Sequence, residues 1–257
     1  MPTVRDKLWI WGHEAGSHND EWDLPGPSRM TPTEGAFYLG VPNALMVSYY
    51  DLPKPPFDRE MRAFAPLKRV VWSIVGESSS ARTDLDEVLR LAGRFPNLCG
   101  AIMDDFFYTE PKESGAISRV SVEQLRGFRA RLQGATRPLD LWVTVYTHDL
   151  RLPIQPYLEP CDVLTFWTWR AEHLADLEGN FARLEALAPA KRKVLGCYMW
   201  DYGPKKPMPL AAMRRQCQLG LEWLRAGRIE GMIFLASCIC DLGLETVEWT
   251  RRWIAEV

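Results

Sequence analysis

Eight short apolar segments recur along the chain, and most are followed by a stretch with helical spacing of apolar residues. Runs of this length, rich in Val, Ile, Trp and Tyr and bounded by Gly, Pro or polar residues, are typical of buried β-strands. No two of them are joined by the two-residue turn of a hairpin, which indicates parallel strands with helical crossovers. The segments are residues 7–12, 43–50, 68–76, 98–108, 139–148, 161–169, 193–200 and 230–237.

The stretches between these segments predict helices. Thr31 or Thr33 can cap the first, which ends near Gly40, and Ser121 can cap the fourth. A Ser-rich loop at residues 78–80 separates the third strand from its helix. The helices are expected at about residues 31–40, 58–65, 84–95, 121–132, 174–187, 210–226 and 246–255.

Strand-then-helix units repeated through a chain of 257 residues predict an α/β protein with one (β/α)8 TIM barrel, a single domain over residues 1–257. The alternative is a doubly wound open sheet. Such a sheet would be expected to carry a Gly-x-Gly-x-x-Gly turn after the first strand, and residues 13–17 have none. The closed barrel is therefore the preferred interpretation.

Composition narrows the class of partner. The net charge of −2 and the lack of a long Lys/Arg run argue against nucleic acid and membrane surfaces, so a small molecule or an oligosaccharide is expected. Six cysteines without a Cys-x-x-Cys pair indicate buried free thiols. With no signal-peptide pattern and no run of 18 apolar residues, we expect a cytoplasmic protein without cofactor or metal, whose oligomeric state is open.

Aromatic and charged side chains gather at the predicted carboxyl ends of the strands, where the chemistry of such barrels lies. Sugar rings stack their C–H faces on Trp and Tyr, and their hydroxyls need directional polar partners, so this mixture favours a carbohydrate. Packing in the core is the alternative for any single Trp. The candidates for substrate binding are His13, Glu14, Trp11, Tyr50, Tyr146, His148, Trp169, Arg170, Tyr198, Trp200 and Tyr202, whereas His18 and His173 look incidental.

Two neighbouring acids, Asp104 and Asp105, end the fourth apolar segment. Adjacent carboxylates at a buried strand end repel and desolvate each other, which raises one pKa and is tolerated mainly where that proton is used. Glycoside hydrolysis usually needs one carboxyl group that stays protonated and a second negative group. The alternative is a cap, in which either carboxylate accepts backbone N–H groups of the next loop.

Residues 100–107, Gly-Ala-Ile-Met-Asp-Asp-Phe-Phe, resemble the catalytic strand of substrate-assisted hexosaminidases, in particular the O-linked N-acetylglucosaminidase family with its consecutive Asp pair. The resemblance covers this strand and the barrel plan. It implies that Asp104 orients the 2-acetamido group of the substrate and that Asp105 is the general acid/base. It also implies that Tyr146, Tyr198 or Tyr202 could hydrogen-bond the acetamide or the sugar hydroxyls.

Other mechanisms remain open. In many retaining barrel glycosidases the acid/base and the nucleophile follow the fourth and seventh strands, which here places Asp105 and Asp201 in those roles, with a loop cap as the alternative for Asp201. A metal-dependent isomerase or hydrolase could use Glu14, Asp105, His148 and Asp241. A carbohydrate-binding barrel without catalysis would have the same aromatic rim.

Overall fold

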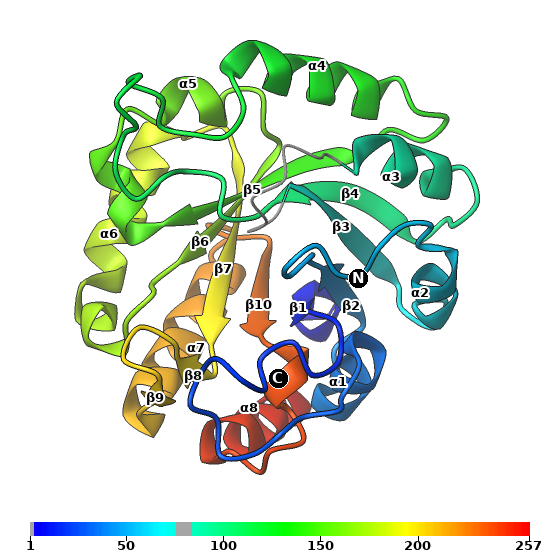
Figure 1. Ribbon diagram of the computed structural model, residues 1–257. Coiled ribbons are helices and arrows are strands. Elements are labelled where there is room, and N and C mark those ends of the chain that lie inside the picture. The colour runs from blue at the N-terminus through cyan, green and yellow to red at the C-terminus, as the bar shows by residue number, and fades with distance from the viewer. Residues whose placement is uncertain (1–2, 76–83) are drawn as a thin grey trace.

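The structure is a computed structural model that describes residues 3–75 and 84–257. Eight parallel strands close into a barrel, in which the first strand pairs with the last, so that Trp9 lies beside Ile233 (Figure 1). The predicted (β/α)8 barrel is therefore confirmed. The strands are β1 Leu8–Gly12, β2 Asn43–Met46, β3 Arg69–Val75, β4 Leu98–Met103, β5 Asp140–Tyr146, β6 Val163–Trp167, β7 Arg192–Tyr198 and β10 Gly231–Leu235.

Helices cover the outside of the barrel (Figure 1). They are α1 Pro32–Leu39, α2 Asp58–Ala63, α3 Leu85–Ala92, α4 Val122–Gln133, α5 Gln155–Leu158, α6 Leu177–Leu187, α7 Leu210–Arg225 and α8 Glu245–Glu256. Short 3-10 turns are η1 Arg5–Lys7, η2 Thr147–Arg151, η3 Ala171–Asp176 and η4 Ser237–Ile239. No helix in the described ranges combines the length and apolar character needed to cross a membrane.

Local chemistry explains where α1 and α4 begin. The Thr31 side chain accepts the Glu34 N–H and the Glu34 carboxylate accepts the Thr31 N–H, which makes a capping box, and Ser121 and Gln124 repeat it at α4. Gly40 ends α1 with a left-handed φ of 73°, as predicted. Thr31, rather than Thr33, is the cap.

Several described elements differ from expectation, and β4, predicted to reach residue 108, ends at Met103. β2 stops at Met46 because Tyr49 and Leu52 pair across a tight turn instead of continuing the strand. The helix expected at 174–187 is split into η3 and α6. The seventh strand, expected to reach residue 200, ends at Tyr198, and β8 Trp200–Asp201 then forms a short antiparallel pair with β9 Lys206–Pro207. The end of the third predicted strand at residue 76 and the loop at 78–80 lie outside the described residues.

Tryptophan rings fill the interior of the barrel. Trp11 lies edge-on to Trp167 with ring centroids 5.0 Å apart, and Trp9 lies in the same way 5.3 Å from Trp142. Each buried Trp removes about 150–250 Å² from water, so these rings are a large part of the core. The ring of Trp167 lies over Gly196, where a Cβ atom would be only 2.0 Å away.

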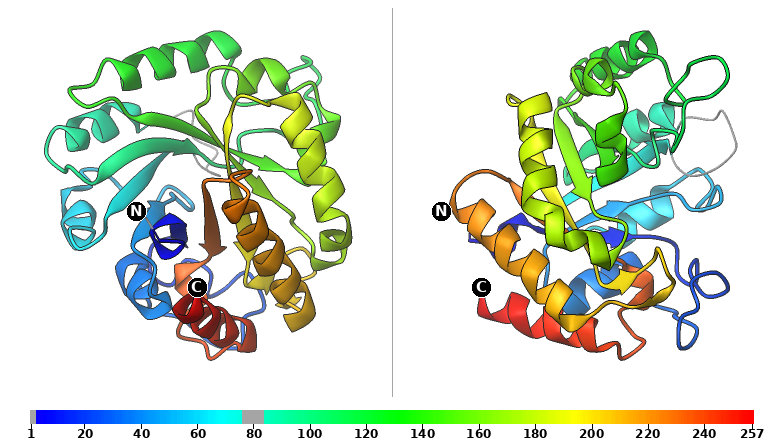
Figure 2. Two further views of the ribbon diagram at one scale, coloured as in Figure 1. Left: turned by 180° about the vertical axis from the view of Figure 1, so that it is seen from behind. Right: turned by 90° about the vertical axis from the view of Figure 1, so that its left-hand side faces the viewer.

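The loops that follow the strands lie on one side of the barrel and both chain ends on the other. In the right-hand view of Figure 2, the first long loop, in dark blue, and the green loop after β4 extend to the same side, opposite the N and C labels. All six cysteines are free thiols, five of them buried. The side with the loops is the barrel mouth, where the candidate residues were expected.

Candidate functional site

The two acids follow directly after β4. The N–H of Asp104 donates to the Val75 carbonyl at 2.9 Å, which extends the sheet by one step, and the Asp104 side chain is buried. Asp105 has a left-handed φ of 42°. This conformation costs a non-glycine residue about 1–2 kcal/mol. Strain of this kind at a buried strand end is typical of functional positions.

Tyr146, the last residue of β5, contacts Asp105 at the centre of the site. The Tyr146 hydroxyl donates to Oδ1 of Asp105 at 2.8 Å. Burial raises the pKa of the Asp105 carboxyl, against the opposing effects of the Tyr146 hydrogen bond and the Arg119 charge. Burial and the charges of Asp105 and Asp104 also raise the pKa of Tyr146 and of Tyr198. The charges of both carboxylates therefore raise the pKa of the same two phenol groups.

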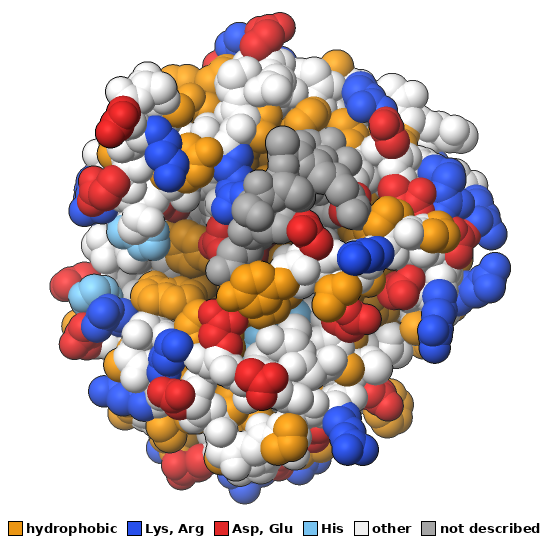
Figure 3. All heavy atoms as spheres, viewed as in Figure 1, with side chains coloured by type: hydrophobic (Ala, Val, Ile, Leu, Met, Phe, Trp, Pro, Cys, Tyr) orange, Lys and Arg blue, Asp and Glu red, His pale blue; other side chains and the backbone are white. Residues whose placement is uncertain are grey.

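A pocket of about 660 Å³ opens at Asp105 on the barrel mouth. Figure 3, drawn from the same side as Figure 1, shows hydrophobic, acidic and histidine side chains next to one another on this face. Aromatic rings dominate the walls, and charged groups lie among them. The lining residues are Trp22, Asp105, Phe107, Tyr108, Thr109, Glu110, Lys112, Arg119, Tyr146, His148 and Trp169.

Trp22 is a wall of the pocket that the sequence interpretation did not name. It comes from the long loop after β1, and its ring lies edge-on to Trp169 at 5.9 Å. Its carbonyl accepts the Trp200 indole N–H at 3.1 Å, and the neighbouring Glu21 carbonyl accepts the Lys205 ammonium at 2.7 Å. The sequence did contain one indication of this role, because Trp22 is an aromatic residue in a loop that is unusually long for a connection between a strand and a helix.

Two histidines fasten that same loop to the barrel. His13 donates from Nδ1 to the Val47 carbonyl at 3.0 Å and accepts the Trp11 indole N–H at Nε2, also at 3.0 Å. Burial lowers the pKa of His13 to about 4. The His18 ring lies 5.0 Å from His13, and its Nδ1 lies 3.1 Å from the Tyr202 hydroxyl. His18, which nothing in the sequence singled out, is therefore a buried anchor of the loop.

The remaining candidates divide into buried and exposed groups. The pocket lining includes Asp105, Tyr146, His148 and Trp169 from the predicted set. Trp11, Tyr198, Trp200 and Tyr202 are buried below or beside it. Glu14, Tyr50 and Arg170 are exposed and do not line it. For Trp11 the core-packing alternative describes the structure, whereas Trp169 faces the pocket.

Asp201 has a structural partner. Its Oδ1 accepts the backbone N–H of Ala171 at 3.1 Å, which ties β8 to the start of η3. Burial raises its pKa, and the Ala171 hydrogen bond opposes that shift. Asp201 does not line the pocket, because the chain turns into the β8–β9 pair after Tyr198. Its geometry is that of the loop cap that was the alternative for this residue.

Asp149 is a further carboxyl group beneath the pocket. Its Oδ2 accepts the Tyr146 N–H at 2.7 Å, and its Oδ1 lies 3.5 Å from Nε2 of His148. The His148 ring is stacked on Tyr146 with centroids 5.1 Å apart, and both side chains line the pocket. Burial raises the pKa of Asp149 to about 7, and the Asp105 charge adds to this effect.

The residues that could serve a metal-dependent enzyme do not form one cluster. Across residues 3–75 and 84–257, no three His, Cys, Asp or Glu side chains form a group that could hold a metal ion. Asp241 accepts the Ser28 hydroxyl at 2.5 Å and the Arg29 N–H at 3.0 Å. It therefore fastens the first loop rather than facing Asp105.

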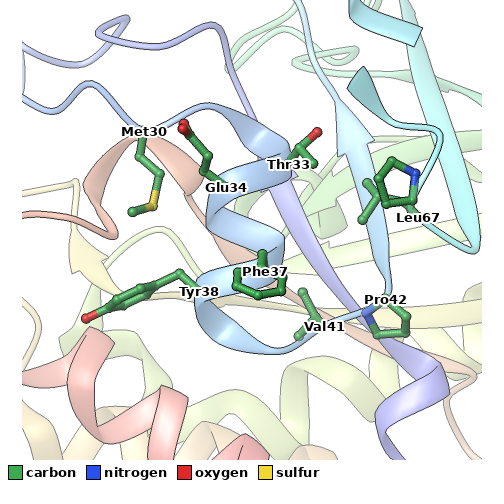
Figure 4. Close-up of a pocket in the computed structure, with 9 residues that line it drawn as sticks. Met30, Thr33, Glu34, Phe37, Tyr38, Val41, Pro42 and Leu67 are labelled. Carbon is green, nitrogen blue, oxygen red and sulfur yellow. The ribbon is translucent and has the colours of Figure 1, made fainter. Parts of the chain in front are cut away.

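A second pocket, of about 570 Å³, lies away from the barrel mouth. Figure 4 shows Phe37 and Tyr38 of α1 beside Val41 and Pro42, with Leu67 opposite. Phe37 is 89% exposed. This apolar surface carries none of the predicted site residues.

No known protein family and no characterised protein matches this chain by sequence. Solved structures do match. One from Bacteroides thetaiotaomicron, whose description proposes an α-L-fucosidase, is 10% identical with a TM-score of 0.61, over 100% of this chain and 97% of that one. The catalytic domain of a hyperthermophilic chitinase from Pyrococcus furiosus is 12% identical with a TM-score of 0.56, over 91% and 85%.

The fold also occurs outside sugar hydrolysis. A protein from Clostridium thermocellum that binds two copies of 5-methyl-5,6,7,8-tetrahydrofolic acid is 8% identical with a TM-score of 0.55, over 97% of this chain and 95% of that one. At such low identity the likeness extends to the fold alone. The chain has the (β/α)8 barrel fold that is found in glycoside hydrolases such as the chitinase.

Proposed function

We propose that this protein is a glycoside hydrolase with Asp105 as its general acid/base. The observation that carries the proposal is the Asp105 carboxyl group itself: it is strained, its pKa is raised by burial, it accepts a hydrogen bond from Tyr146, and it opens into a pocket with aromatic walls. A carboxyl group whose pKa is raised holds its proton to higher pH, and in that form it can protonate the leaving oxygen of a glycosidic bond.

The aromatic walls supply the binding surface. Trp22, from the loop after β1, and Trp169, just after β6, both line the pocket, and aromatic rings of this kind can stack on the C–H faces of a pyranose ring. The pocket volume lies in the range of small-molecule sites. A small glycoside or the end of an oligosaccharide is the substrate that fits this description.

Asp104 is the favoured second carboxylate. It is next to Asp105 in the chain, and its charge raises the pKa of the same phenol groups, Tyr146 and Tyr198. Asp201, in contrast, accepts a hydrogen bond from the Ala171 N–H. If the substrate carries a 2-acetamido group, the resemblance to substrate-assisted hexosaminidases assigns Asp104 to orient it, and the acetamide oxygen then attacks the anomeric carbon as Asp105 protonates the leaving oxygen. Water, deprotonated by Asp105, completes the hydrolysis.

The test is a panel of aryl glycosides, including N-acetylhexosaminides, assayed with the wild type and with Asp105→Asn. We expect turnover of at least one substrate and a loss of about 10²–10⁴-fold in kcat for the variant, because general acid catalysis is removed. Sugar binding by the variant, measured by calorimetry, should persist.

Glu110→Gln is the matched control, since Glu110 lines the same pocket but is paired with Arg151. A purely sugar-binding barrel would bind the panel without turnover in any form. A silent panel together with stoichiometric metal in the purified protein would instead support a metal-dependent enzyme. Either result would refute the hydrolase proposal.

A further inference from the structure

Two buried histidines lie under the loop after β1 without an acid paired to them. His13 is 4% exposed and His18 is 2% exposed. Within residues 3–75 and 84–257, neither ring forms an ion pair with a carboxylate. The other two histidines of the chain each lie beside an acid, in the pairs His148–Asp149 and His173–Glu172. A proton added to His13 or His18 would therefore place an unpaired charge in the interior of the protein.

The hydrogen bonds of His13 fix the neutral form of its ring. The Trp11 indole can only donate, and it donates to Nε2 at 3.0 Å. The Val47 carbonyl can only accept, and it accepts from Nδ1, also at 3.0 Å. A proton on Nε2 would face the indole N–H and break that hydrogen bond. Protonation of His13 thus conflicts with the closed arrangement, in which burial lowers its pKa to about 4.

The His18 ring connects the loop to this group. It belongs to the loop, it lies 5.0 Å from the His13 ring, and its Nδ1 lies 3.1 Å from the Tyr202 hydroxyl. Burial lowers the pKa of His18, and the charge of His13 adds to this effect. Two like charges at this distance repel each other, so the pair stays neutral while both rings are buried.

The groups that face the two rings are uncharged at neutral pH. Burial raises the pKa of the Cys238 thiol to about 12, so this group keeps its proton. Two acids of this region, Glu21 and Asp241, accept the hydroxyl groups of Tyr49 and Ser28. The facing groups are the indoles of Trp11 and Trp22, the phenols of Tyr49 and Tyr202, the Val47 carbonyl, and the side chains of Ser237 and Cys238.

The loop itself, residues 14–30, is held to the barrel by side chains. Its own backbone hydrogen bonds join loop residues to one another, as where the Ser17 N–H donates to the Glu14 carbonyl at 3.1 Å. Among the described residues, no backbone–backbone hydrogen bond joins this loop to the barrel. The loop can therefore leave the barrel without breaking a strand pair. It carries Trp22, a wall of the pocket.

We propose that His13 and His18 form an acid-released latch, which holds the loop and Trp22 at the pocket while both rings are neutral and opens when they take up protons. In the open form the rings meet water and their pKa returns towards the ordinary 6.5, so this form binds more protons below that pH. Closure is favoured above pH 6.5 and weakens as the pH falls below it. The latch adds regulation to the pocket of the proposed hydrolase, on which its kinetic consequences rest, but its opening needs no turnover.

The experiment follows Trp22 by fluorine NMR in protein labelled with 5-fluorotryptophan, with the signal assigned through Trp22→Phe. The chain has 11 Trp, so the other signals report on the barrel in the same spectrum. As the pH falls from about 7.5 to about 4, we expect the Trp22 signal to move to the position of a water-exposed tryptophan while the barrel signals stay. Below pH 6.5 the ratio of open to closed protein should rise about 100-fold per pH unit, about tenfold for each histidine.

Three variants separate titration from simple fastening. His18→Asn keeps a polar atom near Nδ1 but takes up no proton, so the ratio should rise only about tenfold per pH unit. Tyr202→Phe removes the partner of His18 and leaves both rings, so the loop should open at higher pH with the steepness of the wild type. His173→Asn, at an exposed position of η3 outside the pocket, is the matched control and should follow the wild type.

A Trp22 signal that stays buried down to about pH 4 would overturn the proposal. So would a signal that moves only together with those of the barrel, or equal steepness in the wild type and His18→Asn. For any aryl glycoside that is hydrolysed, KM should rise as the loop opens, and by less in His18→Asn. Turnover with an unresponsive Trp22 would overturn the latch and leave the hydrolase standing, whereas a responsive Trp22 with a silent panel would support the latch and refute the hydrolase.

Discussion

Two carboxyl groups that contact Tyr146, the half-buried Asp105 and the buried Asp149, are held in different ways. Asp105 accepts the phenol hydroxyl and opens into the pocket, whereas Asp149 accepts the backbone N–H and is only 1% exposed. In the proposed mechanism the raised pKa of Asp105 has a catalytic use, because this group lines the pocket. The raised pKa of Asp149 instead has its main consequence for the stability of the fold.

Asp149 should destabilise the protein as pH rises. Burial raises its pKa from an ordinary 3.8 to about 7 in the folded state, so the folded state binds the extra proton and stability is lost as pH increases between these values. The loss amounts to at most about 4 kcal/mol at 1.36 kcal/mol per unit. Asp149→Asn keeps an acceptor for the Tyr146 N–H and removes the charge. Urea unfolding at about pH 5 and about pH 8 should show a smaller decrease in the variant; parallel decreases would contradict this role.

The sequence located Asp105 because an apolar run that stops on two acids is a local pattern. It did not distinguish Asp201 from a catalytic carboxylate, since nothing local shows that the chain turns into β8 and β9 there. Trp22 and His18 were missed for a related reason. Their partners, Trp169 and Tyr202, are more than a hundred residues away, and no spacing rule connects them.

At the scale of elements, the packing of β7 against β6 requires a glycine at position 196. The Trp167 ring of β6 crosses Gly196 so closely that a methyl group has no room. Gly196→Ala should lower the free energy of unfolding by about 2 kcal/mol or more, as overpacking of a core does. Gly127→Ala is the matched control: this exposed glycine in α4 has nothing within 4 Å of the added Cβ, so the change should stabilise the helix by about 1 kcal/mol. Similar effects at both positions, in denaturant unfolding, would contradict this account.

Most strand limits agree with the sequence to within a few residues, because buried parallel strands are continuous apolar runs. β2 and β4 are the exceptions, since β2 ends at Met46 instead of residue 50 and β4 at Met103 instead of residue 108. In β2, residues 47, 49 and 50 are still hydrophobic where the backbone leaves the barrel. Tyr50 and Asp51 form the turn there with left-handed φ values of 47° and 61°, and only Asp51 is of a type that favours this conformation. The split of residues 171–187 into η3 and α6 is equally invisible in an apolar pattern that continues through both.

For the molecule as a whole, closure of the barrel could be predicted because eight similar units leave few other arrangements. The length of the loop at residues 17–30 made it a candidate lid, but the residues that it contacts could not be predicted. The loop after β1 reaches Trp169, Trp200 and Lys205 through contacts that exist only once the barrel is closed. The site therefore depends on segments that lie together only because the strands have closed into a barrel.

The pairing of β1 with β10 means that the barrel has no unique starting strand. The Arg5 guanidinium donates to the Ile254 carbonyl at 3.2 Å, so a short Gly/Ser linker can join the two ends. New termini could then be opened at residues 134–138, between α4 and β5. We expect this circular permutant to keep the circular dichroism spectrum and the ligand affinity of the original protein, since every strand retains its neighbours. An unfolded permutant would show that the barrel also depends on the order of the strands along the chain.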